Sequence, residues 1–159
     1  MMLRSVRPAG APQIAALWNR LIVETSITFT LEEKTIDRLE TIIFARGKAF
    51  QVFEQPGSIF GFTTFFQFRH GAGLCTHNRA FNPSWPRNTG HRPWGRFMAA
   101  LKDDARQCGV HSLWAAVSGE NRAGVAFHQE IDFKAIARLP QVGYKFGRWV
   151  DLVLLQKIL

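Results

Sequence analysis

The spacing of apolar residues alternates between the period of a helix and that of a strand, and the order of these segments limits the folds open to the chain. A short strand leads into an amphipathic helix, and a second helix follows. The period then changes to two in a hairpin around Gln55-Pro56-Gly57, and helices alternate with strands from there onward. The predicted segments are strands 3–6, 50–53, 58–68, 112–117, 135–139 and 149–156, and helices 11–24, 32–46, 95–107 and 121–130.

This order predicts an α/β fold in which a mixed sheet of about six to seven strands is flanked by about four helices. A chain of 159 residues with no linker or repeat suits a single domain over 1–159. Apolar residues at 47% and charged residues at 20% exclude wholesale disorder. No apolar run is long enough to cross a membrane and the first ten residues lack a signal peptide, so we expect a cytoplasmic protein. Cys75 and Cys108 give no metal-binding spacing.

The formal charge of +8 is concentrated in the middle of the chain, where no Asp or Glu occurs between Gln55 and Lys102. Such a region attracts polyanions, either nucleic acid or the phosphates of a nucleotide-containing cofactor. No nucleic-acid-binding module or Arg-rich helix with aromatic platforms is present, which disfavours nucleic acid.

Two stretches of the chain carry motifs of an enzyme family. The motifs are Val6-Arg7-Pro8-Ala9, Trp18-Asn19 and Thr28-Phe29 in the first, and Ser118-Gly119-Glu120-Asn121, His128, Ile131-Asp132-Phe133 and Val142-Gly143-Tyr144-Lys145-Phe146-Gly147-Arg148-Trp149-Val150-Asp151 in the second. They resemble the phosphinothricin and methionine sulfoximine acetyltransferases of the GCN5-related N-acetyltransferase (GNAT) superfamily, loosely over 3–73 and strongly over 95–159.

The resemblance implies an acetyl-CoA-dependent N-acetyltransferase that acts on the amine of a small amino-acid-like substrate, and a homodimer. It implies that the cofactor is contacted by two regions, the start of the third helix with its preceding loop and the start of the fourth helix. It implies that the substrate is contacted by residues before the second helix, after the hairpin and in the motif at 142–151. The cofactor residues are Gly90, Arg92, Trp94, Gly95, Arg96 and Asn121, and the substrate residues are Thr28, Phe29, Arg69 and Lys145.

Asn121, Arg69 and the motif residue His128 each have a structural interpretation beside the functional one. Asn121 is a helix cap or a contact to the pantetheine and phosphate arm of the cofactor. His128 is a packed histidine or the acid that protonates the leaving thiolate, and packing is favoured. Arg69 is a solvated strand end or a guanidinium that binds the acidic group of the substrate.

Residues 74–94 depart from the family pattern. The family has a strand with a Glu-His pair here, followed by an Arg-Gly-x-Gly-x-Gly loop whose N–H groups hold the cofactor phosphates. This chain lacks both and has prolines at 83, 86 and 93, so we expect a disrupted central strand and phosphate loop. No catalytic base can be assigned, and a catalytically impaired acetyltransferase-like binding protein is the alternative function, ahead of a basic nucleic-acid-binding domain.

The genetic code offers an explanation for this segment. Read one base out of frame, Arg79-Ala80 can encode Glu and Ala80-Phe81 can encode His. Residues 89–93 can then encode the Arg-Gly-x-Gly core of the phosphate loop. We therefore hypothesise two compensating frame shifts, one near Gly73 and one near Gly95.

The hypothesis predicts the DNA sequence of the segment. We expect the offset frame of codons 74–94 to encode the Glu-His pair and the glycine-rich loop when the gene is sequenced. An offset frame that encodes neither motif would rule the frame shifts out.

Overall fold

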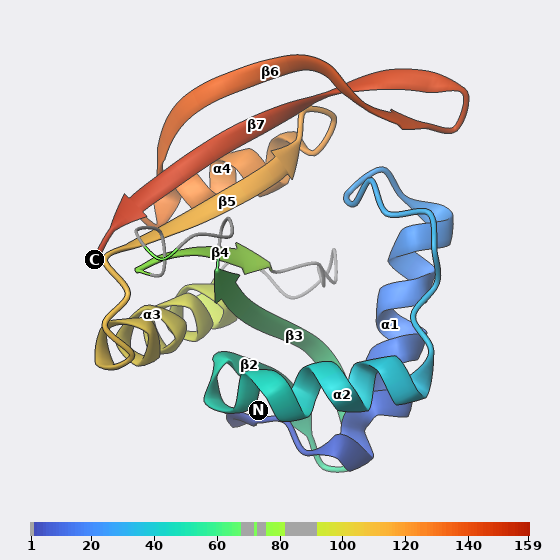
Figure 1. Ribbon diagram of the computed structural model, residues 1–159, viewed down its shortest axis with the longest axis vertical. Coiled ribbons are helices and arrows are strands. Elements are labelled where there is room, and N and C mark those ends of the chain that lie inside the picture. The colour runs from blue at the N-terminus through green and yellow to red at the C-terminus, as the bar shows by residue number, and fades with distance from the viewer. Residues whose placement is uncertain (1, 68–71, 73–75, 82–91) are drawn as a thin grey trace.

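The chain forms one mixed sheet covered by helices (Figure 1). The computed structural model describes residues 2–67, 72, 76–81 and 92–159. The seven strands follow the order β1-β2-β3-β4-β5-β7-β6, and every pair is antiparallel except β4 with β5. They are β1 (Met2–Ser5), β2 (Phe50–Gln55), β3 (Ser58–Gln67), β4 (His77–Phe81), β5 (Ser112–Ser118), β6 (Lys134–Lys145) and β7 (Arg148–Ile158).

Four α-helices cover this sheet, which confirms the expected α/β class. α1 has a proline in its first turn, where the missing N–H costs nothing, and α3 begins at Arg92 rather than at 95. The helices are α1 (Ala11–Glu24), α2 (Ile36–Arg46), α3 (Arg92–Gln107) and α4 (Arg122–Glu130), with short 3₁₀ turns η1 (Pro8–Gly10) and η2 (Gly47–Ala49).

Both faces of β2 and β3 are buried, because successive side chains on a strand point to opposite faces. Phe50, Val52 and Phe62 pack beneath α1 and α2. Phe53 and Phe65 point the other way, into a second apolar cluster that contains residues of α3, α4, β5 and β7. Phe and Thr therefore fill the buried positions of β3 that Val and Ile occupy in most buried strands.

The predicted start of the second helix at residue 32 is wrong, because α2 begins at Ile36. The Asn19 side chain accepts from the Lys34 N–H at 2.7 Å and donates to the Lys34 carbonyl at 2.9 Å, which holds this stretch outside the helix. The Thr35 hydroxyl then caps α2 by accepting from the Arg38 N–H. Ile36, the first residue of α2, is exposed.

The C-terminal hairpin is longer than the predicted strands 135–139 and 149–156. β6 continues through Pro140 because it is an edge strand, where a residue without an N–H is tolerated. Its pairing with β7 shifts register on the way. Phe146 and Gly147 form the two-residue turn, and both have positive φ, 52° and 73°. This is the geometry of a tight hairpin turn, which glycine adopts readily and phenylalanine does not.

The expected disruption of the central strand is corrected for the part that the structure describes. Residues 77–81 form β4, which pairs with β3 on one side and β5 on the other. The strand ends before the prolines at 83 and 86, and Pro93 lies in the first turn of α3, where proline is tolerated. Residues 73–75 and 82–91 lie outside the described chain.

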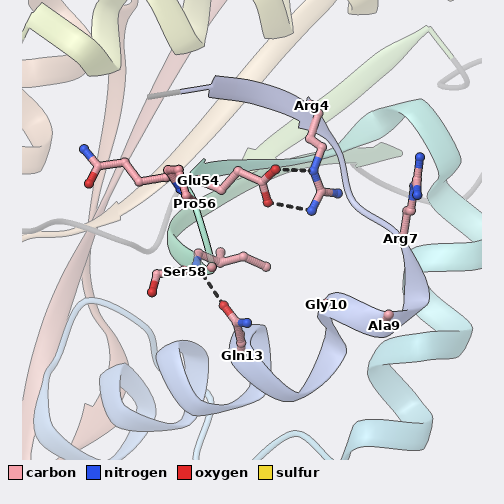
Figure 2. A pocket seen from close by; sticks show the side chains of 11 residues that line it. Arg4, Arg7, Ala9, Gly10, Gln13, Glu54, Pro56 and Ser58 are labelled. Atoms are coloured by element: carbon pink, nitrogen blue, oxygen red, sulfur yellow. Dashed lines mark hydrogen bonds and ion pairs between the residues drawn. The ribbon is translucent and has the colours of Figure 1, made fainter.

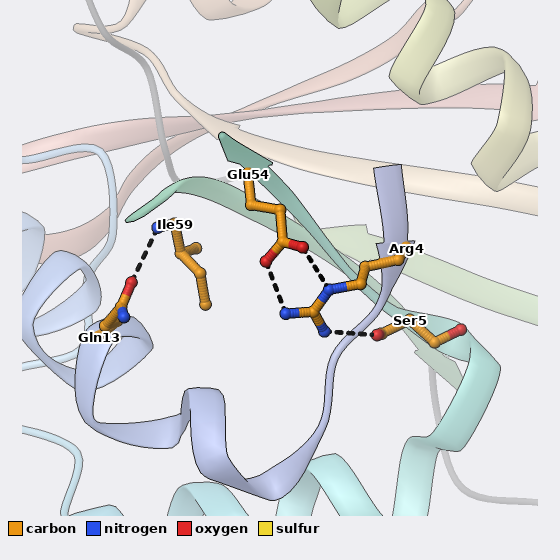
Figure 3. A network of polar contacts seen from close by, with 5 residues as sticks. All are labelled: Arg4, Ser5, Gln13, Glu54 and Ile59. Atoms are coloured by element: carbon orange, nitrogen blue, oxygen red, sulfur yellow. Dashed lines mark hydrogen bonds and ion pairs between the residues drawn. The ribbon is translucent and has the colours of Figure 1, made fainter. Parts of the chain in front are cut away.

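A small pocket of about 670 Å³ near the N-terminus joins β1, α1 and the β2–β3 hairpin (Figure 2). Arg4 donates from Nε and Nη2 to the two carboxylate oxygens of Glu54, at 2.6 and 2.5 Å (Figure 3). Gln13 accepts from the Ile59 N–H at 2.8 Å. Because these polar groups are engaged with one another, the pocket is a structural junction between elements.

Among the described helices, none is long and apolar enough to span a bilayer. The described residues also contain no group of three or more His, Cys, Asp or Glu side chains placed to hold a metal ion.

Candidate active site

A pocket of about 1170 Å³ lies where α1 and the loop after it face the end of β5 and the tip of the β6–β7 hairpin. Each side carries four polar residues, and the α1 side has the larger number of apolar residues. The residues that line it are Leu17, Arg20, Leu21, Glu24, Thr25, Ser26, Ile27, Ile59 and Phe60 on one side, and Glu120, Asn121, Arg122, Ala123, Phe146 and Arg148 on the other.

The pocket lies at the carboxyl end of the parallel pair. β4 and β5 pair from His77↔Ser112 to Ala80↔Ala115, and within the described chain the last residues of β5 pair with β7 alone. Ligand sites of open α/β sheets lie outside the carboxyl ends of their parallel strands. The turn after β5 then opens α4 directly into the pocket, so the positive end of the helix dipole faces it.

Asn121 begins α4. Its Oδ1 accepts from the Gly124 N–H at 2.9 Å, so the cap interpretation from the sequence is confirmed. A Cβ at position 124 would lie 2.4 Å from Asn121 Nδ2, so glycine is required for this close approach. The same Nδ2 makes no hydrogen bond to any other described residue, which leaves a donor available at the pocket.

The loop between α1 and α2 is docked on the C-terminal hairpin. The buried Lys145 ammonium donates to the Thr28 carbonyl at 2.9 Å and reaches the Thr30 carbonyl at 3.5 Å. Phe29 packs on Gly143, where a Cβ would lie 2.7 Å from the ring. Three of the predicted substrate residues, Thr28, Phe29 and Lys145, are thus brought together. Desolvation lowers the pKa of Lys145.

Glu120 precedes Asn121 directly, and the sequence motifs alone indicate no role for it. Arg148 donates to its two oxygens from Nε and Nη2 at 2.7 and 2.8 Å, and the Ser26 hydroxyl donates at 2.6 Å. These hydrogen bonds lower the pKa of Glu120 to about 2, with the Arg148 bond as the larger cause. A carboxylate with such a pKa is a weak proton acceptor near neutral pH.

Arg122 is the one arginine of the pocket without an ion pair in the described part of the chain. Arg148 is paired with Glu120, and Arg20 with Glu24 at 3.0 Å. Arg122 stands in the first turn of α4, so its charge adds to the positive end of the helix. This side of the pocket suits an anionic group.

His128 is buried between the rings of Phe127 and Phe133. Its Nδ1 lies 2.7 Å from the Gly124 carbonyl oxygen, which can only accept, so Nδ1 carries the proton. Burial lowers the pKa of His128, so the ring is neutral at pH 7 and Nε2 has no proton to give. The contacts fit the packed interpretation that the sequence favours.

A family model described as an acetyltransferase (GNAT) domain matches residues 3–154. The chain belongs to the GNAT acetyltransferases. Members of this family use acetyl-CoA as the acetyl donor, and the resemblance seen in the sequence is confirmed.

Relatives and solved structures agree with this assignment. The chain is 29% identical to the L-amino acid N-acyltransferase MnaT of Escherichia coli K12, over 98% of this chain and 92% of the relative. It is 28% identical to the L-methionine sulfoximine/L-methionine sulfone acetyltransferase of Salmonella typhimurium, over 98% of this chain and 93% of the relative. The structure of yncA from Salmonella typhimurium with its cofactor acetyl-CoA superposes with a TM-score of 0.92 at 27% identity, over 99% of this chain and 93% of that chain.

The structure describes only some of the remaining predicted site residues of this GNAT domain. Gly90 and Arg69 lie outside the described residues, as do the side chains of Arg92 and Trp94. Gly95 and Arg96 lie in the first turns of α3 and do not line the pocket. Ser26, Glu120 and Arg148 line it without having been chosen from the sequence. The one signal for them was their place inside or beside the family motifs.

We predict that Asn121→Ser lowers acetyl-CoA affinity while the melting temperature stays near that of the wild type. Serine keeps the cap but removes the amide donor, whereas Asn121→Ala also loses the cap, which costs about 1 kcal/mol of stability. Thr35→Ala, which removes the cap of α2, is the matched control and should lower the melting temperature alone. Calorimetric titration and thermal unfolding measure the two effects. Unchanged affinity in Asn121→Ser would make the residue a cap only.

Proposed function

We propose that this GNAT domain transfers the acetyl group of acetyl-CoA to the amine of a small amino-acid-like substrate. The supporting observation is the pocket at the end of β5, into which α4 opens with the Asn121 amide, whose Nδ2 has no acceptor among the described residues. Two of the relatives are named for L-amino acids and for L-methionine sulfoximine and sulfone. Bound acetyl-CoA would supply an acetyl group activated as a thioester.

The residues present fit a cofactor of this kind. The start of α4 offers N–H groups, the Asn121 amide and the Arg122 charge, which suit the phosphates and amides of the coenzyme A arm. Gly90, Arg92, Trp94, Gly95 and Arg96 remain part of the proposed cofactor site.

The apolar residues on the α1 side of the pocket suit an apolar side chain on the substrate. Leu17, Leu21 and Phe60 line it, and the predicted substrate residues Thr28 and Phe29 follow in the adjoining loop. Arg69 remains the proposed partner of the substrate's acidic group. Lys145, the other proposed substrate residue, supports the loop that carries Thr28. A pocket that holds both reactants in line lowers the barrier by orientation alone.

The second candidate is an acetyltransferase-like protein with impaired catalysis. Both carboxylates that line the described pocket, Glu24 and Glu120, are ion-paired, and the pKa of Glu120 is held at about 2. Glu120 is therefore unsuited to take a proton from the substrate ammonium near pH 7. Residues 74–94 of the written sequence also lack the family's Glu.

Acetyl-CoA binding and turnover separate these candidates. At a concentration of about 100 times its Kd, acetyl-CoA should stabilise the native state by about 2.7 kcal/mol, which raises the melting temperature by about 5–10 °C. Release of free thiol should follow when methionine sulfoximine or phosphinothricin is added. A shift without turnover would favour the impaired protein, and no shift would contradict cofactor binding altogether. A variant carrying the offset-frame peptide at 74–94 should be faster by about 10²–10⁴.

We further propose that the domain forms a homodimer through the edge strand β6 and that it acts in the cytoplasm. β6 has one unpaired edge, and exposed apolar side chains gather on it and on its partner strand. Tyr144 and Trp149 form a cross-strand ring pair with centroids 4.9 Å apart, and both are more than half exposed. A second copy related by a two-fold axis would cover the same patch on each chain.

Light scattering tests the dimer. Trp149→Lys should shift the mass in solution from twice the chain mass to the chain mass, because it places a charge in the proposed interface. Phe44→Lys changes an exposed aromatic residue on α2, 84% exposed, and should leave the mass unchanged. Equal masses for wild type and Trp149→Lys would place any interface elsewhere.

A further inference from the structure

Three segments that are far apart in the sequence meet at one carboxylate in the pocket. Ser26 comes from the loop after α1, Glu120 from the turn between β5 and α4, and Arg148 from the start of β7. We call these three side chains the Glu120 junction. All of them line the pocket, so the junction joins its two walls at one rim.

The junction also fixes the tip of the hairpin. Arg148 follows directly on the turn formed by Phe146 and Gly147, and the Phe146 backbone has φ of 52°, which is unfavourable for a non-glycine residue. The Arg148 guanidinium lies 5.8 Å from the Phe146 ring centroid, and Phe146 itself lines the pocket. The two hydrogen bonds from Arg148 to Glu120 therefore hold an aromatic ring in place over the pocket.

The chemistry of the junction is unsuited to proton transfer and contributes little to folding. Glu120 stays ionised at every pH at which the protein is expected to work. Its partners are half-exposed, and ion pairs of that kind contribute little to stability because water and salt screen them. What such a bidentate pair supplies is geometry.

We propose that Glu120 is a positioning residue for the amine substrate. Together with Ser26 and Arg148 it sets the distance between the α1–α2 loop and the hairpin tip. This distance sets the width of the part of the pocket proposed to bind the amine, which we call the amine pocket. The inference rests on the proposed acetyltransferase function and deepens it. The contacts of Lys145 with Thr28 and of Phe29 with Gly143 hold the rest of the loop, so loss of the junction frees the rim alone.

Steady-state kinetics of Glu120→Ala, Glu120→Gln and Arg148→Ala test this role. Arg138→Ala is the matched control, because Arg138 forms an ion pair with Asp151 at 2.7 Å on the same hairpin but does not line the pocket. We expect Glu120→Ala and Arg148→Ala to raise KM for the amine about fivefold, with kcat and acetyl-CoA affinity nearly unchanged. Glu120→Gln keeps one acceptor oxygen but loses the bidentate pair, so its KM should lie between those of the wild type and Glu120→Ala with kcat retained. Arg138→Ala should match the wild type. The double variant Glu120→Ala/Arg148→Ala should be no worse than either single variant.

Two results would overturn the proposal. If Glu120→Gln lost kcat as fully as Glu120→Ala, with loss of the acidic limb of the pH profile, Glu120 would be the base. If Arg148→Ala matched Arg138→Ala in KM, the junction would not shape the pocket.

Hydrogen–deuterium exchange gives a readout that does not depend on activity. We expect amides of residues 25–30 to exchange faster in Glu120→Ala and Arg148→Ala than in the wild type and in Arg138→Ala. If these two variants exchange faster but the wild type acetylates no amine, the result would support the junction and contradict the proposed function. Unchanged exchange in an active enzyme would contradict the junction and leave the proposed function intact.

Discussion

The parallel pairing of β4 with β5 determines where every functional element of this domain lies. Parallel strands need a crossover, which α3 supplies, and their carboxyl ends reach the same edge of the sheet. The chain that leaves β5 turns at Glu120 and enters α4 at that edge. β1, β2 and β3 extend the sheet on one side of the pair, and β7 and β6 extend it on the other (Figure 1). The pocket occupies the place where these two arms separate.

The walls of the pocket depend on contacts between the arms, because the α1–α2 loop has no regular structure to fix its path. Its carbonyl groups are the acceptors that a buried ammonium requires, and Lys145 has Thr28 and Thr30 within reach. The Lys145 hydrogen bonds, the Phe29 ring on Gly143 and the hydrogen bond from Ser26 to Glu120 therefore fix the path of this loop. The shape of the amine pocket follows from a few side chains of the terminal motif.

Sequence reasoning finds the features that depend on neighbours along the chain. It gives the type of almost every element, the cap at Asn121 and the family motifs of both ends.

It misses the start of α2, because the partner of Lys34 is Asn19, fifteen residues earlier. It stops β6 at Pro140, because nothing local marks that strand as an edge. It assigns no role to Glu120, whose partners are 94 and 28 residues away. Proline content alone misjudged the central strand, which ends before the first of the prolines.

The two apolar clusters of the domain differ in how far they reach across the sheet. The cluster with α3 and α4 runs from Phe53 and Phe65 to Leu155, and so crosses from one arm to the other. The cluster beneath α1 and α2 ends with Phe62 and contains no residue of β5 or β7. The larger cluster therefore joins the two arms of the sheet, whereas the smaller one packs the α1–α2 layer on a single arm.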